Sequence, residues 1–136
     1  MRIAINGFGR IGRAVFRIAD ALDDIEIVAI NDLFDPNALG YLLTFDTVMG
    51  RFEGGVSIED EYLVTPRSSV RMYQERNPAD LPWDDLGIDA VVESTGVFRS
   101  REQLTQHLDA GAQRVLLTGG LPGTRLRSTH HLRNVP

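Results

Sequence analysis

The sequence predicts an α/β fold, in which an open, mostly parallel sheet carries helices on both of its faces. Short apolar runs of strand length alternate along the chain with segments whose apolar residues recur at helical spacing. A glycine-rich turn joins the first apolar run to the first helical segment, and an acidic residue follows the second apolar run. This alternation is typical of parallel strands joined by right-handed helical crossovers.

A first strand, expected over residues 2–6, runs directly into the motif Gly7-Phe8-Gly9-Arg10-Ile11-Gly12. Gly7 permits the tight turn, Gly9 allows a pyrophosphate to approach the backbone, and Gly12 lets the following helix pack closely on the sheet. The helix N-terminus offers unpaired N–H groups and a partial positive charge to the phosphates. The motif favours a dinucleotide site, and the alternative is a turn without a ligand.

The helix is expected from Arg10 to about Leu22, and a second strand over residues 25–31. The apolar residues at helical spacing are Ile11, Val15, Ile18, Ala19 and Leu22. Asp32 comes 20 residues after Gly12. An acid at this place would accept a hydrogen bond from a ribose hydroxyl and repel a 2′-phosphate, so NAD is preferred over NADP. The alternative for Asp32 is a bond to local backbone at the strand end.

A second helix is expected to begin at Asp35-Pro36-Asn37, because proline suits the first helical turn. Its apolar face is supplied by Leu39, Leu42 and Leu43. Glycines then break the regular pattern over residues 50–55, and short alternating runs predict an antiparallel excursion. These runs cover residues 56–58, 62–64 and 70–73. A loop that includes Trp83 is expected to pack back onto the domain.

Two further strands are expected, over residues 89–93 and 114–118. The first of them ends at Ser94-Thr95-Gly96. Ser100 and Gln103 fit a capping box that opens a helix, and Gly111 closes this helix. His107 lies among polar residues of the helix, so we expect it to be exposed to solvent or to act at the helix end.

Composition excludes several classes of function. The hydrophobic content is 43%, and no apolar run approaches the ~18 residues that a membrane span needs. The first strand starts within two residues of the N-terminus, which leaves no room for a secretory signal, so a cytoplasmic location is expected. The absence of cysteine excludes disulfides, thiolate metal sites and a thiol nucleophile in this chain. The net charge of -5 argues against nucleic-acid binding.

The charge is distributed unevenly. Residues 119–136 contain three arginines and no acid, whereas residues 1–118 contain 11 arginines and 19 acids, a net charge of -8. The composition therefore changes abruptly at Gly119-Gly120. Within the last segment, His130-His131 could suggest a metal site, but adjacent histidines point in different directions and lack a third ligand. A poorly ordered tail is the preferred interpretation.

The chain resembles glyceraldehyde-3-phosphate dehydrogenase over residues 1–118, through an ordered set of motifs. The segments that carry the resemblance are Asn6–Arg13, Ala29–Leu33, Phe45–Val48, Gly50–Phe52, Glu75–Pro78, Leu81–Trp83, Glu93–Phe98 and His107–Ala112. The resemblance implies a Rossmann-type NAD-binding domain of a glycolytic oxidoreductase that oxidises and phosphorylates an aldehyde phosphate. It implies NAD as the cofactor, with the pyrophosphate on the N–H groups of Arg10 and Ile11 and the adenosine ribose on Asp32.

The resemblance also implies cofactor contacts further along the chain. Arg76 would lie beside the adenine, Thr95 and Gly96 would line the cleft, and Thr118 would approach the nicotinamide end. Each has a simpler alternative: solvation of a surface arginine for Arg76, satisfaction of a strand end for Thr95, and ordinary strand packing for Thr118.

The chain departs from the family pattern after Thr118. Members of the family continue with another sheet strand, a segment with the catalytic cysteine, and a second domain, and residues 119–136 match none of these. We therefore expect an NAD-binding domain over residues 1–118, with a sheet incomplete at its C-terminal end, and a tail unlike the family. A truncated gene product or a shifted reading frame would explain this. Without a thiol nucleophile, independent turnover is not expected.

Two other classes of function stay open from the sequence. The chain could be a binding or assembly module without chemistry, which binds NAD or associates with copies of itself or with full-length relatives through an open sheet edge. It could also be another nucleotide enzyme on the same kind of sheet, such as a methyltransferase or a homoserine-type dehydrogenase. The segments Asn6–Arg13 and Glu93–Phe98 favour the NAD-binding domain over this last class.

Overall fold

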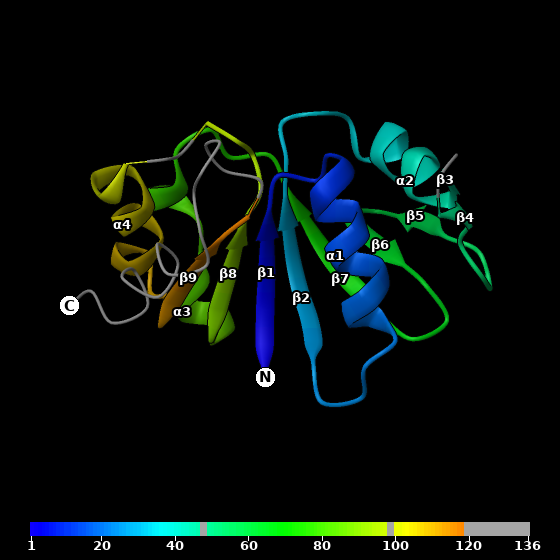
Figure 1. Cartoon of the computed structure of the whole chain (residues 1–136), viewed down its shortest axis with the longest axis horizontal. Coiled ribbons are helices and arrows are strands. Elements are labelled where there is room, and N and C mark those ends of the chain that lie inside the picture. The colour runs from blue at the N-terminus through cyan, green and yellow to red at the C-terminus, as the bar shows by residue number, and fades with distance from the viewer. Residues whose placement is uncertain (47–48, 98–99, 119–136) are drawn as a thin grey trace.

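The computed structural model describes residues 1–46, 49–97 and 100–118. These residues build a seven-stranded sheet with the strand order β5-β6-β7-β2-β1-β8-β9 (Figure 1). The strands are β1 (Arg2–Asn6), β2 (Glu26–Asn31), β5 (Ser57–Glu59), β6 (Tyr62–Val64), β7 (Ser69–Tyr73), β8 (Ala90–Glu93) and β9 (Arg114–Leu117). From β7 to β9 all neighbours are parallel, and only the pairs β5–β6 and β6–β7 are antiparallel. The predicted open, mostly parallel α/β sheet is confirmed, including the antiparallel excursion.

Helices cover both faces of this sheet. They are α1 (Arg10–Asp20), α2 (Pro36–Thr44), α3 (Trp83–Leu86), α4 (Arg101–Asp109) and a 3₁₀ turn at Pro78–Asp80. In β1, Ile3 and Ile5 pack in one core with Phe16 of α1, whereas Ala4 between them packs in a second core with Trp83 of α3. This alternation is the period-two pattern of a strand buried on both sides. Figure 1 shows α1 and α2 over the β2–β5 half, and α3 and α4 beside β8 and β9.

Two small features of the fold were not predicted from the sequence. A two-stranded antiparallel ribbon pairs β3 (Phe45–Asp46) with β4 (Gly50–Arg51), in a stretch that the glycines had marked as irregular. The expected loop around Trp83 contains the short helix α3 and the 3₁₀ turn before it. Elements this short carry too little periodic pattern to be recognised in a sequence.

Helix α1 buries only part of the predicted face: Ala19 is buried and Val15 packs against the core, but other predicted positions are exposed. Ile18 is 61% exposed, and Ile11 and Leu22 are also exposed. The buried positions of the helix are Gly12, Phe16, Ala19 and Asp20. For Ile11, Ile18 and Leu22 the prediction was wrong because it followed the large aliphatic side chains, whereas the close approach of the helix to the sheet at its glycine decides which face is buried.

Helix α2 begins as predicted, because the Asp35 side chain accepts a hydrogen bond from the Ala38 N–H at 3.2 Å. Leu39 and Leu43 are fully buried in the first core. Leu42 is 41% exposed, so its predicted place on the apolar face is wrong. Positions 39 and 43 are four residues apart and lie one above the other, while position 42 is rotated away from them.

Helix α4 carries the predicted capping box. The Ser100 hydroxyl accepts from the Gln103 N–H, and the Gln103 side chain accepts from the Ser100 N–H, both at 3.1 Å. Gly111 ends the segment with φ at 114°, and a Cβ on it would lie 2.4 Å from the Asp84 Cβ. A side chain is therefore excluded there by both backbone conformation and space. Residues 119–136, including His130-His131, lie outside the described residues.

Candidate cofactor site

A cavity of about 700 Å³ opens at the carboxyl ends of β1, β2, β7 and β8. The chain passes from β1 outward to β2 and β7, and then returns to place β8 on the other side of β1. Such a reversal of strand order leaves a crevice at the carboxyl edge of an open α/β sheet, where ligands bind. The lining residues are Asn6, Gly7, Gly9, Asn31, Asp32, Leu33, Phe34, Glu75, Arg76, Ser94, Thr95 and Val97.

The three glycines of the turn meet different neighbours. Gly7 has φ at 97°, and a Cβ on it would lie 2.6 Å from the Thr95 nitrogen. A Cβ on Gly12 would lie 2.1 Å from the carbonyl oxygen of Gly7, so both positions need glycine for the fold itself. Gly9 is the N-cap of α1 and lines the cavity, yet a Cβ there would meet nothing within 4 Å. No contact among the described residues requires the absence of a side chain at position 9.

Helix α1 points its N-terminus at the same cavity. Gly9 caps it without a side-chain hydrogen bond, and the Arg10 and Ile11 side chains are exposed. The first N–H groups of a helix have no intrahelical acceptor and carry a partial positive charge. An anion that enters beside Gly9 would therefore meet N–H donors instead of side chains.

Asp32 faces the cavity and also holds the backbone around it. Its Oδ2 accepts from the Phe8 N–H at 2.7 Å and its Oδ1 accepts from the Phe34 N–H at 2.9 Å. The carboxylate thus joins the glycine turn to the loop after β2, which is the local backbone role left open by the sequence. Each carboxylate oxygen keeps a further lone pair, so the same side chain can still accept from a ribose hydroxyl.

The structure gathers some of the predicted site residues and leaves others outside the cavity. Gly7, Gly9, Asp32, Arg76 and Thr95 line it, and Arg76 is exposed at its mouth. The predicted residues that do not line it are Arg10, Ile11, Gly12, Gly96 and Thr118. Gly96 has φ at 79° directly after Thr95, and Thr118 donates from both its N–H and its hydroxyl to the Glu93 carbonyl. Thr118 therefore has the ordinary strand contacts that the sequence left open as the alternative to a cofactor contact.

Polar residues that the sequence analysis did not single out form the floor of the cavity. Asn6 and Asn31, the last residues of β1 and β2, are buried and linked by a hydrogen bond of 2.7 Å from the Asn31 amide to the Asn6 oxygen. Asn6 also donates to Glu93, the last residue of β8, at 2.6 Å. A polar residue at the end of each of three apolar strands is the signal that could have identified them.

His107 is fully buried, so the expectation that it is exposed was wrong. Its Nδ1 lies 3.0 Å from the Trp83 indole nitrogen, and its Nε2 lies 2.7 Å from Glu93 Oε1. An indole N–H can only donate, so Nδ1 must be the acceptor and the ring proton lies on Nε2. His107 is therefore a neutral histidine that donates to Glu93, held inside the domain by α3 and β8.

Two side chains near the site titrate away from their ordinary values. Burial lowers the pKa of the Arg13 guanidinium, which donates to the Phe8 carbonyl at 2.9 Å under the glycine turn. Burial raises the pKa of the Tyr73 hydroxyl at the end of β7. Both shifts reflect the loss of solvation that disfavours a charged group.

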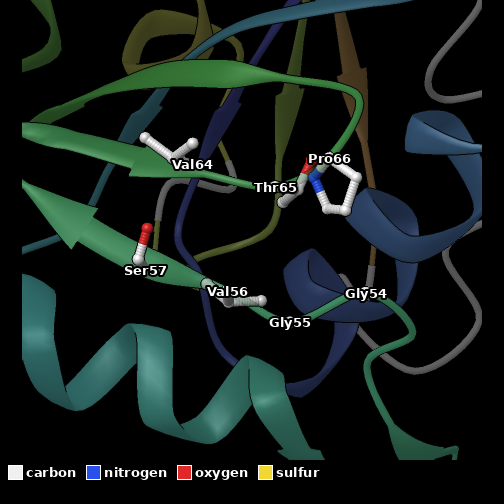
Figure 2. Close-up of a pocket in the computed structure, with 7 residues that line it drawn as sticks. All are labelled: Gly54, Gly55, Val56, Ser57, Val64, Thr65 and Pro66. Carbon is white, nitrogen blue, oxygen red and sulfur yellow. The ribbon is translucent and has the colours of Figure 1, made fainter.

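A second cavity among the described residues, of about 560 Å³, is lined in part by Arg17, Arg51 and Arg67. A smaller cavity of about 410 Å³ lies beside β5 and β6, and Figure 2 shows the side chains that line it. They are Gly54, Gly55, Val56, Ser57, Val64, Thr65 and Pro66, none of which carries a charge. In the described part of the chain, no cluster of His, Cys, Asp or Glu could hold a metal ion. No helix within the same ranges is long and apolar enough to cross a membrane.

A strand, a glycine turn, a helix N-terminus and a strand-end acid at the switch point of a parallel sheet define a Rossmann-type dinucleotide-binding domain. Residues 1–101 match the family model described as glyceraldehyde 3-phosphate dehydrogenase, NAD binding domain. The chain belongs to this family, and NAD is the cofactor of the family's domain. The resemblance seen in the sequence is confirmed.

Relatives of known name agree with this assignment. The chain is 49% identical over 119 residues to a glyceraldehyde-3-phosphate dehydrogenase of Escherichia fergusonii and 48% identical over 119 residues to glyceraldehyde-3-phosphate dehydrogenase A of Escherichia coli. In both cases 88% of this chain and 36% of the relative are covered. A glyceraldehyde-3-phosphate dehydrogenase of Klebsiella pneumoniae is 51% identical over 115 residues, which are 85% of this chain and 38% of the relative. The chain spans little more than a third of these relatives.

Proposed function

We propose that this chain binds NAD in the cavity at the carboxyl ends of β1, β2, β7 and β8, as the NAD-binding domain of a glyceraldehyde-3-phosphate dehydrogenase-like oxidoreductase. The observation that carries the proposal is Gly9, at the helix N-terminus beside the cavity, where no contact among the described residues requires the absence of a side chain. The absence of a side chain there leaves room for a pyrophosphate to reach the N–H groups of Arg10 and Ile11.

The other proposed contacts keep the assignments made from the sequence. Asp32 accepts from the adenosine ribose, and Arg76 at the cavity mouth lies beside the adenine. Thr95 and Gly96 form the opposite wall, and Thr118 lies towards the nicotinamide end. Gly7 and Gly12 take part by shaping the turn, since a Cβ on either would collide with backbone atoms.

Calorimetric titration of the chain with NAD, NADP and S-adenosylmethionine tests this proposal. NAD should bind more tightly than NADP, because the Asp32 carboxylate repels a 2′-phosphate and the next residue, Leu33, offers no cation. S-adenosylmethionine lacks the diphosphate and should give no saturable heat. Saturable binding of S-adenosylmethionine without NAD binding would assign the cavity to a different class of nucleotide enzyme.

A matched pair of glycine variants separates the ligand role from the structural role. Gly9→Ala should lower the free energy of unfolding by no more than about 1 kcal/mol, because alanine is a poorer N-cap than glycine, and should weaken NAD binding at least about tenfold, because the new methyl group enters ligand space. Gly12→Ala should lower the free energy of unfolding by roughly 3 kcal/mol or more, since its Cβ would overlap the Gly7 carbonyl. Unchanged NAD affinity in the Gly9→Ala variant would contradict the proposed position of the pyrophosphate.

The proposed role in catalysis is limited to holding the hydride acceptor. NAD, when bound, accepts a hydride from the aldehyde carbon, but the family's chemistry also needs a thiolate nucleophile, and these 136 residues contain no cysteine. We therefore propose that residues 1–118 form the binding domain, that residues 119–136 lie outside it, and that this chain alone does not turn over. An assay with aldehyde phosphate, NAD and inorganic phosphate checks this, and robust turnover would contradict it.

A second proposed property is association with copies of this chain or with full-length relatives. The supporting observation is an exposed aromatic pair beside α2, where Tyr41 is 64% and Phe45 is 47% exposed with ring centroids 4.9 Å apart. Light scattering over a concentration series measures it, and a clean monomer at high concentration would exclude self-association.

We also propose a cytoplasmic location, which fractionation of the native cell tests.

A further inference from the structure

A chain of buried polar side chains runs beneath the cavity from α3 to the end of β7. Its central members are Asn6, Asn31, Glu93 and His107, and each is at most 4% exposed. They come from four different elements, β1, β2, β8 and α4, so the chain of hydrogen bonds crosses the carboxyl edge of the sheet. Buried polar groups are costly unless they are paired, which makes their hydrogen-bond directions informative.

Glu93 is the common acceptor of this chain. Its Oε1 accepts from the Asn6 amide at 2.6 Å and from His107 Nε2 at 2.7 Å, and its Oε2 accepts from the Thr95 N–H at 3.0 Å and the Thr95 hydroxyl at 2.6 Å. All four partners can donate to it, so the hydrogen bonds of this network converge on one side chain. Every other side chain in this hydrogen-bond network can also donate a hydrogen bond.

One branch of this hydrogen-bond network runs from Glu93 to the side of the cavity where the adenine is proposed to lie. Because the Asn6 NH₂ must face Glu93, its oxygen faces Asn31 and accepts from the Asn31 amide at 2.7 Å. The Asn31 oxygen then accepts from the Glu75 N–H at 2.8 Å, and the Asn31 NH₂ donates to the Glu75 carbonyl at 2.9 Å. The backbone of Glu75 is thus clamped, and the next residue is Arg76 at the cavity mouth.

The other branch ends in the opposite wall of the cavity. The Thr95 hydroxyl donates to Glu93 and therefore accepts with its free lone pair from the Val97 N–H at 3.2 Å. Thr95 and Val97 both line the cavity. The segment from β8 to Val97 contains Gly96 at a positive φ, which is a conformation that needs support from neighbouring contacts.

We propose that Glu93 is the positioning residue of this site, which fixes both walls of the cavity in the geometry that receives the cofactor. It acts through Thr95 on one wall and through Asn6 and Asn31 on the other, and it does not touch the ligand. This inference rests on the proposed NAD-binding function. Glutamine has the same shape as glutamate but only one acceptor oxygen. In Glu93→Gln the side-chain NH₂ group would therefore face hydrogen-bond donors, either those of Thr95 or those of Asn6 and His107.

The binding experiment compares Glu93→Gln with two controls by calorimetric titration with NAD. Glu93→Gln should weaken binding at least about tenfold. Glu102→Gln makes the same charge change on the exposed side of α4, and Leu63→Ala destabilises the core at β6 far from the cavity. Both controls should bind NAD within about twofold of the unchanged chain. Glu93→Gln binding as tightly as the controls would overturn the inference and leave the proposed function intact.

Amide hydrogen exchange without NAD tests the positioning directly. Glu93→Gln should speed exchange at the Thr95 and Glu75 amides at least about tenfold relative to the Thr65 amide, which donates to the Ser68 carbonyl in the turn between β6 and β7. Equal acceleration at all three amides would show a merely structural role and overturn the inference. If the unchanged chain binds no NAD, the proposed function fails, and this exchange pattern still decides whether Glu93 holds the two walls.

Thr95→Val provides a second variant if Glu93→Gln does not fold. It removes only the half-buried hydroxyl, so the Val97 amide loses its acceptor and should exchange at least about tenfold faster. NAD binding should weaken about tenfold, and the double variant Glu93→Gln/Thr95→Val should bind no more weakly than Glu93→Gln alone. Additive losses in the double variant, or unchanged Val97 exchange in the single one, would contradict action through Thr95.

Discussion

Asp32 has a proposed role in ligand binding and a second role in holding the backbone, and its position in the sequence does not distinguish between them. The spacing from the glycine turn indicates a ribose contact, and the structure adds hydrogen bonds to the Phe8 and Phe34 N–H groups. A side chain that organises the cavity in the absence of ligand is pre-organised for binding, because less ordering is needed when the ligand arrives. The acid therefore contributes to the stability of the free chain as well as to the proposed recognition of NAD.

Asp32→Asn should lower the free energy of unfolding of the ligand-free chain by about 1–3 kcal/mol, because an asparagine can accept from only one of the two N–H groups. Asp35→Asn is the matched control, since it makes the same charge change three residues away and asparagine remains a good N-cap for α2. The control should stay within about 0.5 kcal/mol of the unchanged chain. Chemical denaturation measures both, and equal stability of the two variants would show that Asp32 has no structural task.

His107 shows why single residues were harder to predict than motifs. Several polar residues surround it on α4, and this suggested exposure, but the helix buries His107 together with Leu104 and turns it towards Trp83 and Glu93. Both partners are distant in the sequence, 24 and 14 residues away. The glycine motif, in contrast, is contained in consecutive residues, so the sequence alone was enough to predict its turn.

At the scale of elements, the helix faces were less predictable than the helices themselves. The capping box of α4 and the start of α2 were correct because these signals are local hydrogen bonds. The buried face of α1 was only partly correct, because Phe16 rather than Ile18 enters the core against Phe8, with ring centroids 5.7 Å apart. The spacing of apolar residues predicts that an amphipathic helix is present more reliably than it predicts which face of the helix is buried.

Two adjacent leucines of α2 provide a direct test of helix orientation. Leu43→Ala should lower the free energy of unfolding by about 2–5 kcal/mol, since this side chain is fully buried in the core beneath the helix. Leu42→Ala should cost less than about 1 kcal/mol, because its side chain is 41% exposed. Chemical denaturation with a common m value measures both changes. Equal losses would place both leucines on the buried face, as the sequence alone had suggested.

At the scale of the whole molecule, the strand order places the proposed cofactor site. The sequence predicted most strands to within a residue or two, and it predicted the parallel character of the sheet. It did not predict that β8 pairs with β1 on the side opposite β2, because that pairing joins residues such as Ile5 and Val92 that are far apart in the chain. The cavity exists only because of this arrangement. Motif residues could therefore be proposed from the sequence, whereas Asn6, Asn31 and Glu93 required the structure.

The two larger cores of the domain share the central strands, so they should unfold together. Successive residues of β1, such as Ala4 and Ile5, enter opposite cores, and neither core can lose its packing without disturbing the strand that supports the other.

The chain contains a single tryptophan, Trp83, which is fully buried in the α3 core and hydrogen-bonded to His107. Its fluorescence therefore reports one core, while far-UV circular dichroism reports the whole domain. In a urea titration the two signals should give coincident transitions with the same midpoint and m value. A tryptophan transition at lower urea than the dichroism transition would show that the face carrying α3 and α4 unfolds as a separate unit, and the shared strands would then not couple the two layers.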